Sequence, residues 1–176
     1  MQPALHLLDR VTRRVNAVFA FAACVIVLAI VAVIIREVFF RYVLNAPSVW
    51  AMDGSSFALV FVFFLALGPA LESGHHVRVD LFDPLVPARF HRHQKVAGHI
   101  LTVAFGLVLF WYLLDTTIEA FQSNELTYSV IPVPLKYVYW IGPVGTFEFV
   151  LTAIVLLLRA WLEPPSPVGE RALAGH

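Results

Sequence analysis

Four long apolar runs alternate with short polar stretches along the chain. Each run is bounded by charged residues, and each is close to the length of about 20 residues that a helix needs to cross a bilayer. The runs cover residues 15–35, 54–71, 96–114 and 137–158. This pattern predicts an all-α integral membrane protein, a single domain over residues 1–176 with four transmembrane helices. Residues 163–176 are expected to form a flexible cytoplasmic tail.

Composition supports a membrane protein and removes several other classes. The chain is 60% hydrophobic and 14% charged, with a mean hydropathy of +0.80. Its zero net charge does not suggest a nucleic-acid partner. A lone cysteine, Cys24, cannot support a thiol relay within one chain. The first apolar run is too long for a signal peptide and lacks a clear small-residue cleavage site, so it is interpreted as an uncleaved helix.

The distribution of lysine and arginine predicts the orientation in the bacterial inner membrane. If the N-terminus is cytoplasmic, nine of these residues lie inside and three outside, as the positive-inside rule requires. The inner set is Arg10, Arg13, Arg14, Arg78, Arg89, Arg92, Lys95, Arg159 and Arg171, and the outer set is Arg36, Arg41 and Lys136. We therefore expect both termini and the 72–95 connection to be cytoplasmic, with basic groups near lipid headgroups.

The 72–95 connection concentrates histidines, which raises the question of a metal, haem or catalytic site. It holds four of the seven histidines, and His99 follows in the third run. His91 and His93 are two residues apart and would point to different faces of a helix. His99 is the only histidine within an apolar run, so a second axial haem ligand is missing. A solvated basic turn is the favoured interpretation, without a metal, cofactor or catalytic residue.

The stretch "REVFFRYVLNAPSVWAMDGSSFALVFVFFLALGPALESGHHVRVDLF", residues 36–82, carries an ordered set of motif residues. An arginine ends the first helix, a Trp and an acid open the second, a small residue lies near its end, and an H-x-x-x-D stretch follows. Downstream come an Ile-Pro and a Pro-x-Gly element. The residues are Arg41, Trp50, Asp53, Gly68 (with Ala66 as the alternative small residue), His76, Asp80, Pro132, Pro143 and Gly145.

This set resembles the small (DctQ-type) membrane subunit of tripartite ATP-independent periplasmic (TRAP) transporters. Two positions depart from the family pattern: Met52 replaces the first acid of a carboxylate pair, and Glu72 stands where a basic residue is common. The resemblance implies transport without enzymatic activity. A periplasmic binding protein would capture an organic acid (a C4-dicarboxylate, keto acid, sugar acid or sialic acid), and a large membrane subunit would import it with sodium. The small subunit would pack against the large one as scaffold.

The sequence itself agrees with a supporting role, because it shows no pair of broken helices of the kind that forms a transporter's substrate site. The alternative from another class is a haem- or quinone-associated membrane anchor of a redox enzyme.

Three charged residues carry specific expectations. Arg41 and Asp53 flank the outer hairpin and either form a salt bridge or remain two separate solvated charges. Glu148 lies inside the fourth run, where an ionised acid is costly. It is expected to be a neutral carboxyl bonded to a backbone or hydroxyl group, or else to contact the large subunit. If the span begins only after Pro143, Glu148 lies near the outer interface.

Overall fold

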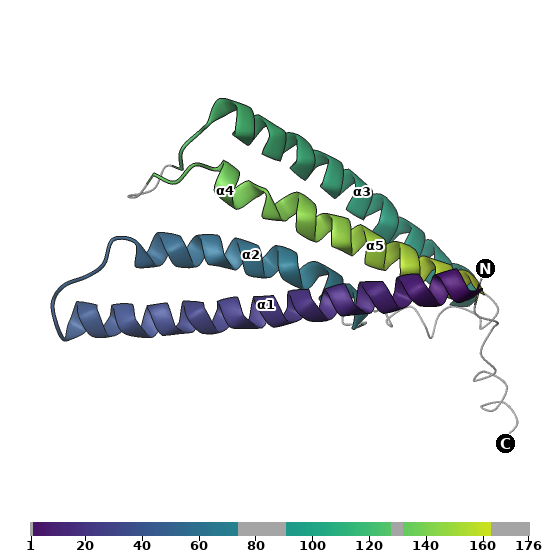
Figure 1. Ribbon diagram of the computed structural model, residues 1–176, viewed down its shortest axis with the longest axis horizontal. Coiled ribbons are helices and arrows are strands. Elements are labelled where there is room, and N and C mark those ends of the chain that lie inside the picture. Colours follow the sequence, from purple (N-terminus) through teal and green to yellow (C-terminus); the bar gives the residue numbers. More distant parts are fainter. Residues whose placement is uncertain (1, 74–90, 128–131, 163–176) are drawn as a thin grey trace, which may run out of the picture.

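The computed structural model describes residues 2–73, 91–127 and 132–162, and their regular structure is helical (Figure 1). The elements are α1 (Gln2–Tyr42), α2 (Ala51–Glu72), α3 (His91–Ser123), α4 (Lys136–Tyr139) and α5 (Ile141–Leu162). Four candidate spans are long and apolar enough to cross a membrane, which confirms the all-α, four-span prediction. The expectations for His75, His76, Asp80, the side chains of His91 and His93, and the 163–176 tail lie outside the described residues.

The helices extend beyond the apolar runs that predicted them. α1 has 41 residues, about 62 Å at 1.5 Å per residue, twice the thickness of a typical hydrocarbon core. α1 and α3 each end shortly before an asparagine with positive φ, Asn45 (49°) and Asn124 (50°). Asparagine tolerates this left-handed conformation better than most residues, so it stops a helix. Hydropathy marks the membrane-embedded part of a helix, whereas these local signals set its ends.

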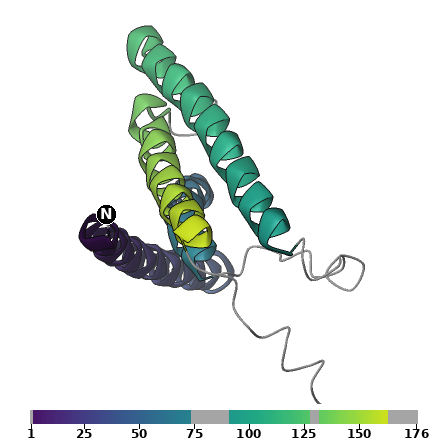
Figure 2. The same ribbon diagram turned by 90° about the vertical axis from the view of Figure 1, so that its right-hand side faces the viewer.

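α5 lies at the centre of the described bundle. It packs against α2 and α3 and, less extensively, against α1, while α1 pairs with α2 (Figures 1 and 2). In its most apolar stretch 61% of residues are buried, compared with 6% for α3. The start of α1 and the ends of α2 and α5 lie at one end of the molecule, and the turn joining α1 to α2 lies at the other (Figure 1). The cytoplasmic assignment of the first end remains a prediction.

Pro143 explains the break between α4 and α5. A proline has no N–H, so the carbonyl four residues earlier, that of Tyr139, receives no helical hydrogen bond from it. The hydroxyl of Thr117 on α3 lies 3.2 Å from this carbonyl oxygen and shares its hydrogen between it and the nearer carbonyl of Leu113, at 2.6 Å. The candidate span nevertheless runs from Lys136 to Leu162. α5 runs through Pro143 as one helix from Ile141 to Leu162, and the depth of Glu148 in the membrane remains a prediction.

Gly145 allows α2 and α5 to touch backbone to backbone. A Cβ at this position would lie 2.8 Å from the carbonyl carbon of Phe64 and closer still to its oxygen. Gly106 plays a similar part between α3 and α5, where a Cβ would lie 2.9 Å from the Val150 side chain. Small residues at helix contacts are how membrane helices gain close packing. The Pro-x-Gly element thus shapes the start of α5 and fixes its distance from α2.

Candidate functional site

The hairpin between α1 and α2 is held by Glu37, a carboxylate to which the sequence analysis assigned no role. Glu37 on α1 accepts hydrogen bonds from the backbone N–H of Ser48 at 3.2 and 3.3 Å, and from the Ser48 hydroxyl. Arg41 lies one turn beyond Glu37, and its Nη2 is 3.4 Å from Glu37 Oε1. Of the two alternatives expected for Arg41 and Asp53, the salt bridge does not form in the structure, where Arg41 pairs with Glu37 instead. An acid four residues away on the same helix reaches the guanidinium without any loop having to close.

Asp53 and Trp50 lie at the beginning of α2 without strong internal partners. Asp53 occupies the first turn, where the helix dipole favours an acid. Its Oδ2 atom is covered yet has no hydrogen-bond partner among the described residues. Trp50 is 44% exposed, and the guanidinium carbon of Arg36 lies 5.5 Å from its ring centre and 4.1 Å from that of Phe40. Arg36 thus links the two ends of the hairpin through aromatic rings.

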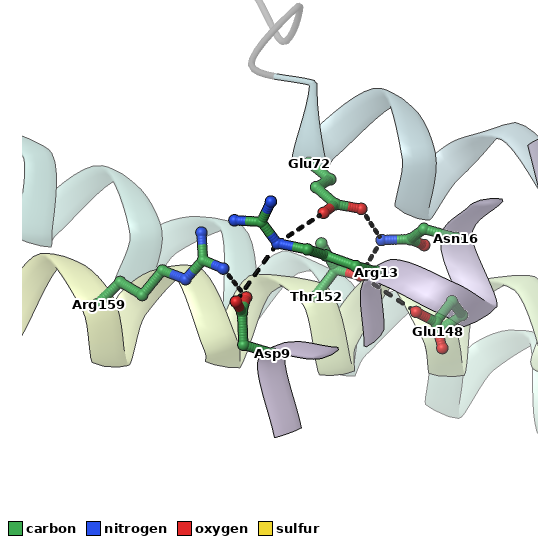
Figure 3. A network of polar contacts seen from close by, with 7 residues as sticks. All are labelled: Asp9, Arg13, Asn16, Glu72, Glu148, Thr152 and Arg159. Atoms are coloured by element: carbon green, nitrogen blue, oxygen red, sulfur yellow. Dashed lines mark hydrogen bonds and ion pairs between the residues drawn. The ribbon is translucent and has the colours of Figure 1, made fainter. Parts of the chain in front are cut away.

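Seven polar side chains from three helices form what we call the interior network (Figure 3). It lies at the end of the bundle opposite the α1–α2 turn and extends into the bundle. Its members come from α1, α2 and α5: Asp9, Arg13, Asn16, Glu72, Glu148, Thr152 and Arg159. Its connections span 56 and 136 residues of sequence. The network therefore ties the first and last long helices to the end of α2.

The ion pairs of the network lie toward the end of the bundle. Arg13 Nε is 3.3 Å from Asp9 Oδ2 and 3.6 Å from Glu72 Oε1. Arg159 also pairs with Asp9. The Arg13 side chain is 57% exposed, whereas those of Asp9, Glu72 and Arg159 are only 20–26% exposed. Through these pairs Arg13 joins α1 to α2, and Asp9 joins α1 to α5.

The hydrogen-bonded part of the network lies deeper. Asn16 Nδ2 donates to Glu72 Oε2 at 2.8 Å and to Thr152 Oγ1 at 3.1 Å. The Thr152 hydroxyl donates in turn to Glu148 Oε1 at 3.3 Å. Asn16 and Thr152 are each 2% exposed and Glu148 is 5% exposed. Removing one partner of a buried polar group costs about 1–3 kcal/mol, so these bonds fix how the three helices sit against one another.

Gly68 provides the space in which this inner part assembles. A Cβ there would lie 2.5 Å from Asn16 Oδ1 and 3.1 Å from Glu148 Cγ. Asn16 from α1 and Glu148 from α5 therefore pack together over Gly68, the small residue of the motif. The Glu148 carboxyl accepts a hydrogen bond from the Thr152 hydroxyl inside the bundle, in agreement with the expected hydroxyl contact.

Other motif residues lie apart from the network. Pro132 is exposed in the connection between α3 and α4. This connection is held by backbone bonds from Thr127 to Val133 and from Leu135 to Glu125, both at 2.9 Å. His99 lies on α3, and among the described side chains no three His, Cys, Asp or Glu residues gather as a metal-binding group.

Sequence reasoning missed Asn16, Asp9 and Thr152. Asn16 is the second residue of the first apolar run, and a buried amide in a spanning helix is a recognisable signal for a polar contact. Glu72 was noted only as a departure from the family pattern. Its role depends on Asn16 and Arg13, which lie far away in sequence.

The family "Tripartite ATP-independent periplasmic transporters, DctQ component" matches residues 30–163. The chain belongs to this family. This confirms the resemblance inferred from the motif residues, and with the four apolar helices it identifies a multi-pass membrane protein of a transporter family.

The chain is also similar to the isethionate TRAP transporter permease protein DctMQ of Oleidesulfovibrio alaskensis, with 25% identity over 136 residues. The match covers 74% of this chain and 21% of that relative, so the chain spans about a fifth of the relative's length.

Proposed function

We propose that this chain is the small permease subunit of a sodium-driven TRAP transporter that imports organic acids, and that it packs as scaffold against a large membrane subunit. The observation that carries this proposal is the family match over residues 30–163 of a four-span helical fold. We place the protein in the bacterial inner membrane with both termini in the cytoplasm. Substrate capture belongs to a periplasmic binding protein, and translocation belongs to the large subunit.

The internal organisation of the bundle supports a scaffold. The network side chains bond mainly to one another across α1, α2 and α5. α4 and α5 are separated at Trp140, but the carbonyl of Tyr139 is used by Thr117 within the same chain. A broken helix that serves a substrate site leaves such groups free for the substrate or ion. The polar side chains of the interior network hold helices together instead.

The relative from Oleidesulfovibrio alaskensis supports the association with a large subunit. Its name, DctMQ, combines M and Q, and the part similar to this chain is about a fifth of its length. We infer that the remaining length performs the work that a separate large subunit performs for this chain. The relative is named for isethionate, a small organic anion. We keep the wider class of organic acids for this protein, because its scaffold role does not select the substrate.

The outer end of the hairpin is our candidate contact with the large subunit. Trp50 is partly exposed, and Asp53 Oδ2 is covered without a partner among the described residues. A donor from the large subunit would satisfy this carboxylate. Replacing Asp53 by Asn should therefore lower association with the large subunit more than replacing the exposed Glu119 on α3 by Gln, which serves as a matched control.

The function is tested by deleting the gene in its native host and measuring uptake of labelled organic acids. Dicarboxylates, keto acids, sugar acids, sialic acid and isethionate form the panel. Uptake of at least one of them should be lost, should return when this chain is supplied in trans, and should require sodium outside. Unchanged uptake of the whole panel would contradict the proposal. A respiratory defect instead would favour the redox-anchor alternative.

A further inference from the structure

A groove lies between α2 and α3, nearer to the end of the bundle that carries the α1–α2 turn (Figure 1). Its volume is about 250 Å³. α2 and α3 both pack against α5 but make little contact with each other, so the groove lies where two spanning helices separate. Its walls include Val60 and Phe64 from α2 and Tyr112 and Thr116 from α3, and its floor includes Val138 and Gly142 from the α4–α5 region.

The threonine hydroxyl groups in the groove are already used within the chain. Thr116 Oγ1 donates to the Tyr112 carbonyl at 2.9 Å. The Thr117 hydroxyl shares its hydrogen between the carbonyls of Leu113 and Tyr139, at 2.6 and 3.2 Å. The groove therefore presents a mainly apolar surface. An apolar cavity of about 150 Å³ is enough to bind benzene, so this groove has room for one bulky apolar side chain.

An acceptor without a donor lies on the same face of α2. Val60 and Phe64 follow Asp53 by seven and eleven residues, or about two and three helical turns, so the three side chains project to the same side. The Oδ2 atom of Asp53 is covered and has no hydrogen-bond partner among the described residues. A lipid tail would fill the groove but would leave this carboxylate without a donor. A segment of protein can supply both the apolar side chain and the donor.

α3 is also the least covered of the four spans in the described structure. In its most apolar stretch 6% of residues are buried, compared with 61% for the span that contains α5. Tyr112, which lines the groove, is 68% exposed. A helix seated between α2 and α3 would cover this side chain and give α3 a second long helix to pack against.

We propose that this groove is the docking site for a transmembrane helix of the large subunit. The docked helix inserts a bulky apolar side chain between Val60 and Tyr112 and brings a hydrogen-bond donor to Asp53. Asp53 and Val60 lie about 10 Å apart along α2, at 1.5 Å per residue, so on a partner helix aligned with α2 the two groups are about seven residues apart. The site rests on the proposed function, because it needs a large subunit, and it extends the contact suggested for Asp53 along α2 as far as Phe64.

Filling the groove tests its role as a docking site. Thr116→Trp places an indole in the groove, whereas Ile118→Trp, two residues further along α3, points to the opposite side, where Ile118 is 48% exposed. Each tagged full-length variant is purified gently from the native host, and the large subunit recovered with it is quantified by mass spectrometry. We expect Thr116→Trp to lower this recovery about tenfold or more, as the loss of a central interface contact does, and Ile118→Trp to leave it unchanged.

Photo-crosslinking tests the occupant directly. Benzoylphenylalanine replaces either Tyr112, which lines the groove, or Trp111, which is 74% exposed and lies about 100° away around α3. We expect the large subunit to be crosslinked from position 112 and not from position 111. The crosslinked peptide should come from one of its transmembrane helices and contain a side-chain hydrogen-bond donor about seven residues from the point of attachment.

The results separate the docking site from the proposed function. If the wild-type chain recovers no large subunit, the proposed function fails and the docking site fails with it. If the wild type recovers the large subunit and Thr116→Trp recovers as much, or if position 112 crosslinks to a lipid or to a second copy of this chain, only the docking site is overturned. A crosslinked peptide without a donor at the expected spacing would remove Asp53 from the site. If Thr116→Trp does not fold, the crosslink from position 112 decides alone.

Discussion

Replacing Gly145 by Ala should destabilise the bundle through one atom. The added Cβ would lie 2.8 Å from the carbonyl carbon of Phe64 and closer to its oxygen, well inside ordinary van der Waals contact. The Cβ is fixed to the α5 backbone and the Phe64 carbonyl is part of the α2 backbone, so neither can rotate away. α2 and α5 must separate by about 1 Å, and a gap of that size forfeits a quarter to a half of each dispersion contact along the interface.

The expected loss is about 1–3 kcal/mol, the usual range for overpacking a well-packed interior. An alanine within a helix is by itself favourable by about 0.5–1 kcal/mol over glycine, which reduces the net effect. Gly98 on α3 isolates this propensity term, because no heavy atom of the described structure lies within 4 Å of a Cβ there. Gly98→Ala should therefore be neutral or slightly stabilising.

The measurement is the free energy of unfolding of the full-length chain in mixed micelles, from titration with a denaturing detergent followed by tryptophan fluorescence. Gly145→Ala should unfold at a lower denaturant fraction than wild type, and Gly98→Ala at the same or a higher one. Equal stability of the two variants would refute the close approach of α2 and α5 on which the description of the bundle depends.

Two further predictions rest on contacts in the bundle, and a third rests on the distribution of lysine and arginine. The charge reversals Arg41→Asp and Asp53→Arg should have additive effects on co-purification with the large subunit, because Arg41 pairs within its own helix; rescue in the double variant would show a direct bridge. Gly68→Ala should lower the free energy of unfolding by about 1–3 kcal/mol, as its Cβ would displace the Asn16 amide; wild-type stability would contradict the packing over this glycine. Reporter fusions after Gln94 should be active only with a cytoplasmic reporter, and those after Asn124 only with a periplasmic one; the reverse pattern would overturn the orientation.

The four spans were predictable because each is a long apolar run bounded by charge. Helix ends were less so: hydropathy does not report that α1 continues to Tyr42 or that Asn45 then turns the chain. The sequence motif includes Pro143 and Gly145 but does not explain their structural roles. The structure supplies the reason, since Pro143 frees a carbonyl that Thr117 uses and Gly145 brings two backbones together.

The interior network was the part that sequence could not supply. Asn16 forms hydrogen bonds with residues 56 and 136 positions away. Such pairings depend on which helices lie next to one another in the bundle. The partner of Arg41 was also not determined by the sequence alone. The hairpin made Asp53 a reasonable partner, yet a nearer acid on the same helix was available in Glu37.

Gentle detergent purification of the tagged chain from its native host, with mass spectrometry of the associated proteins and a visible spectrum, tests the central claim most directly. The account predicts stoichiometric recovery of a large multi-span membrane protein and no Soret band. Recovery of a redox enzyme together with a Soret band, or of the chain alone under conditions that preserve other membrane complexes, would contradict it.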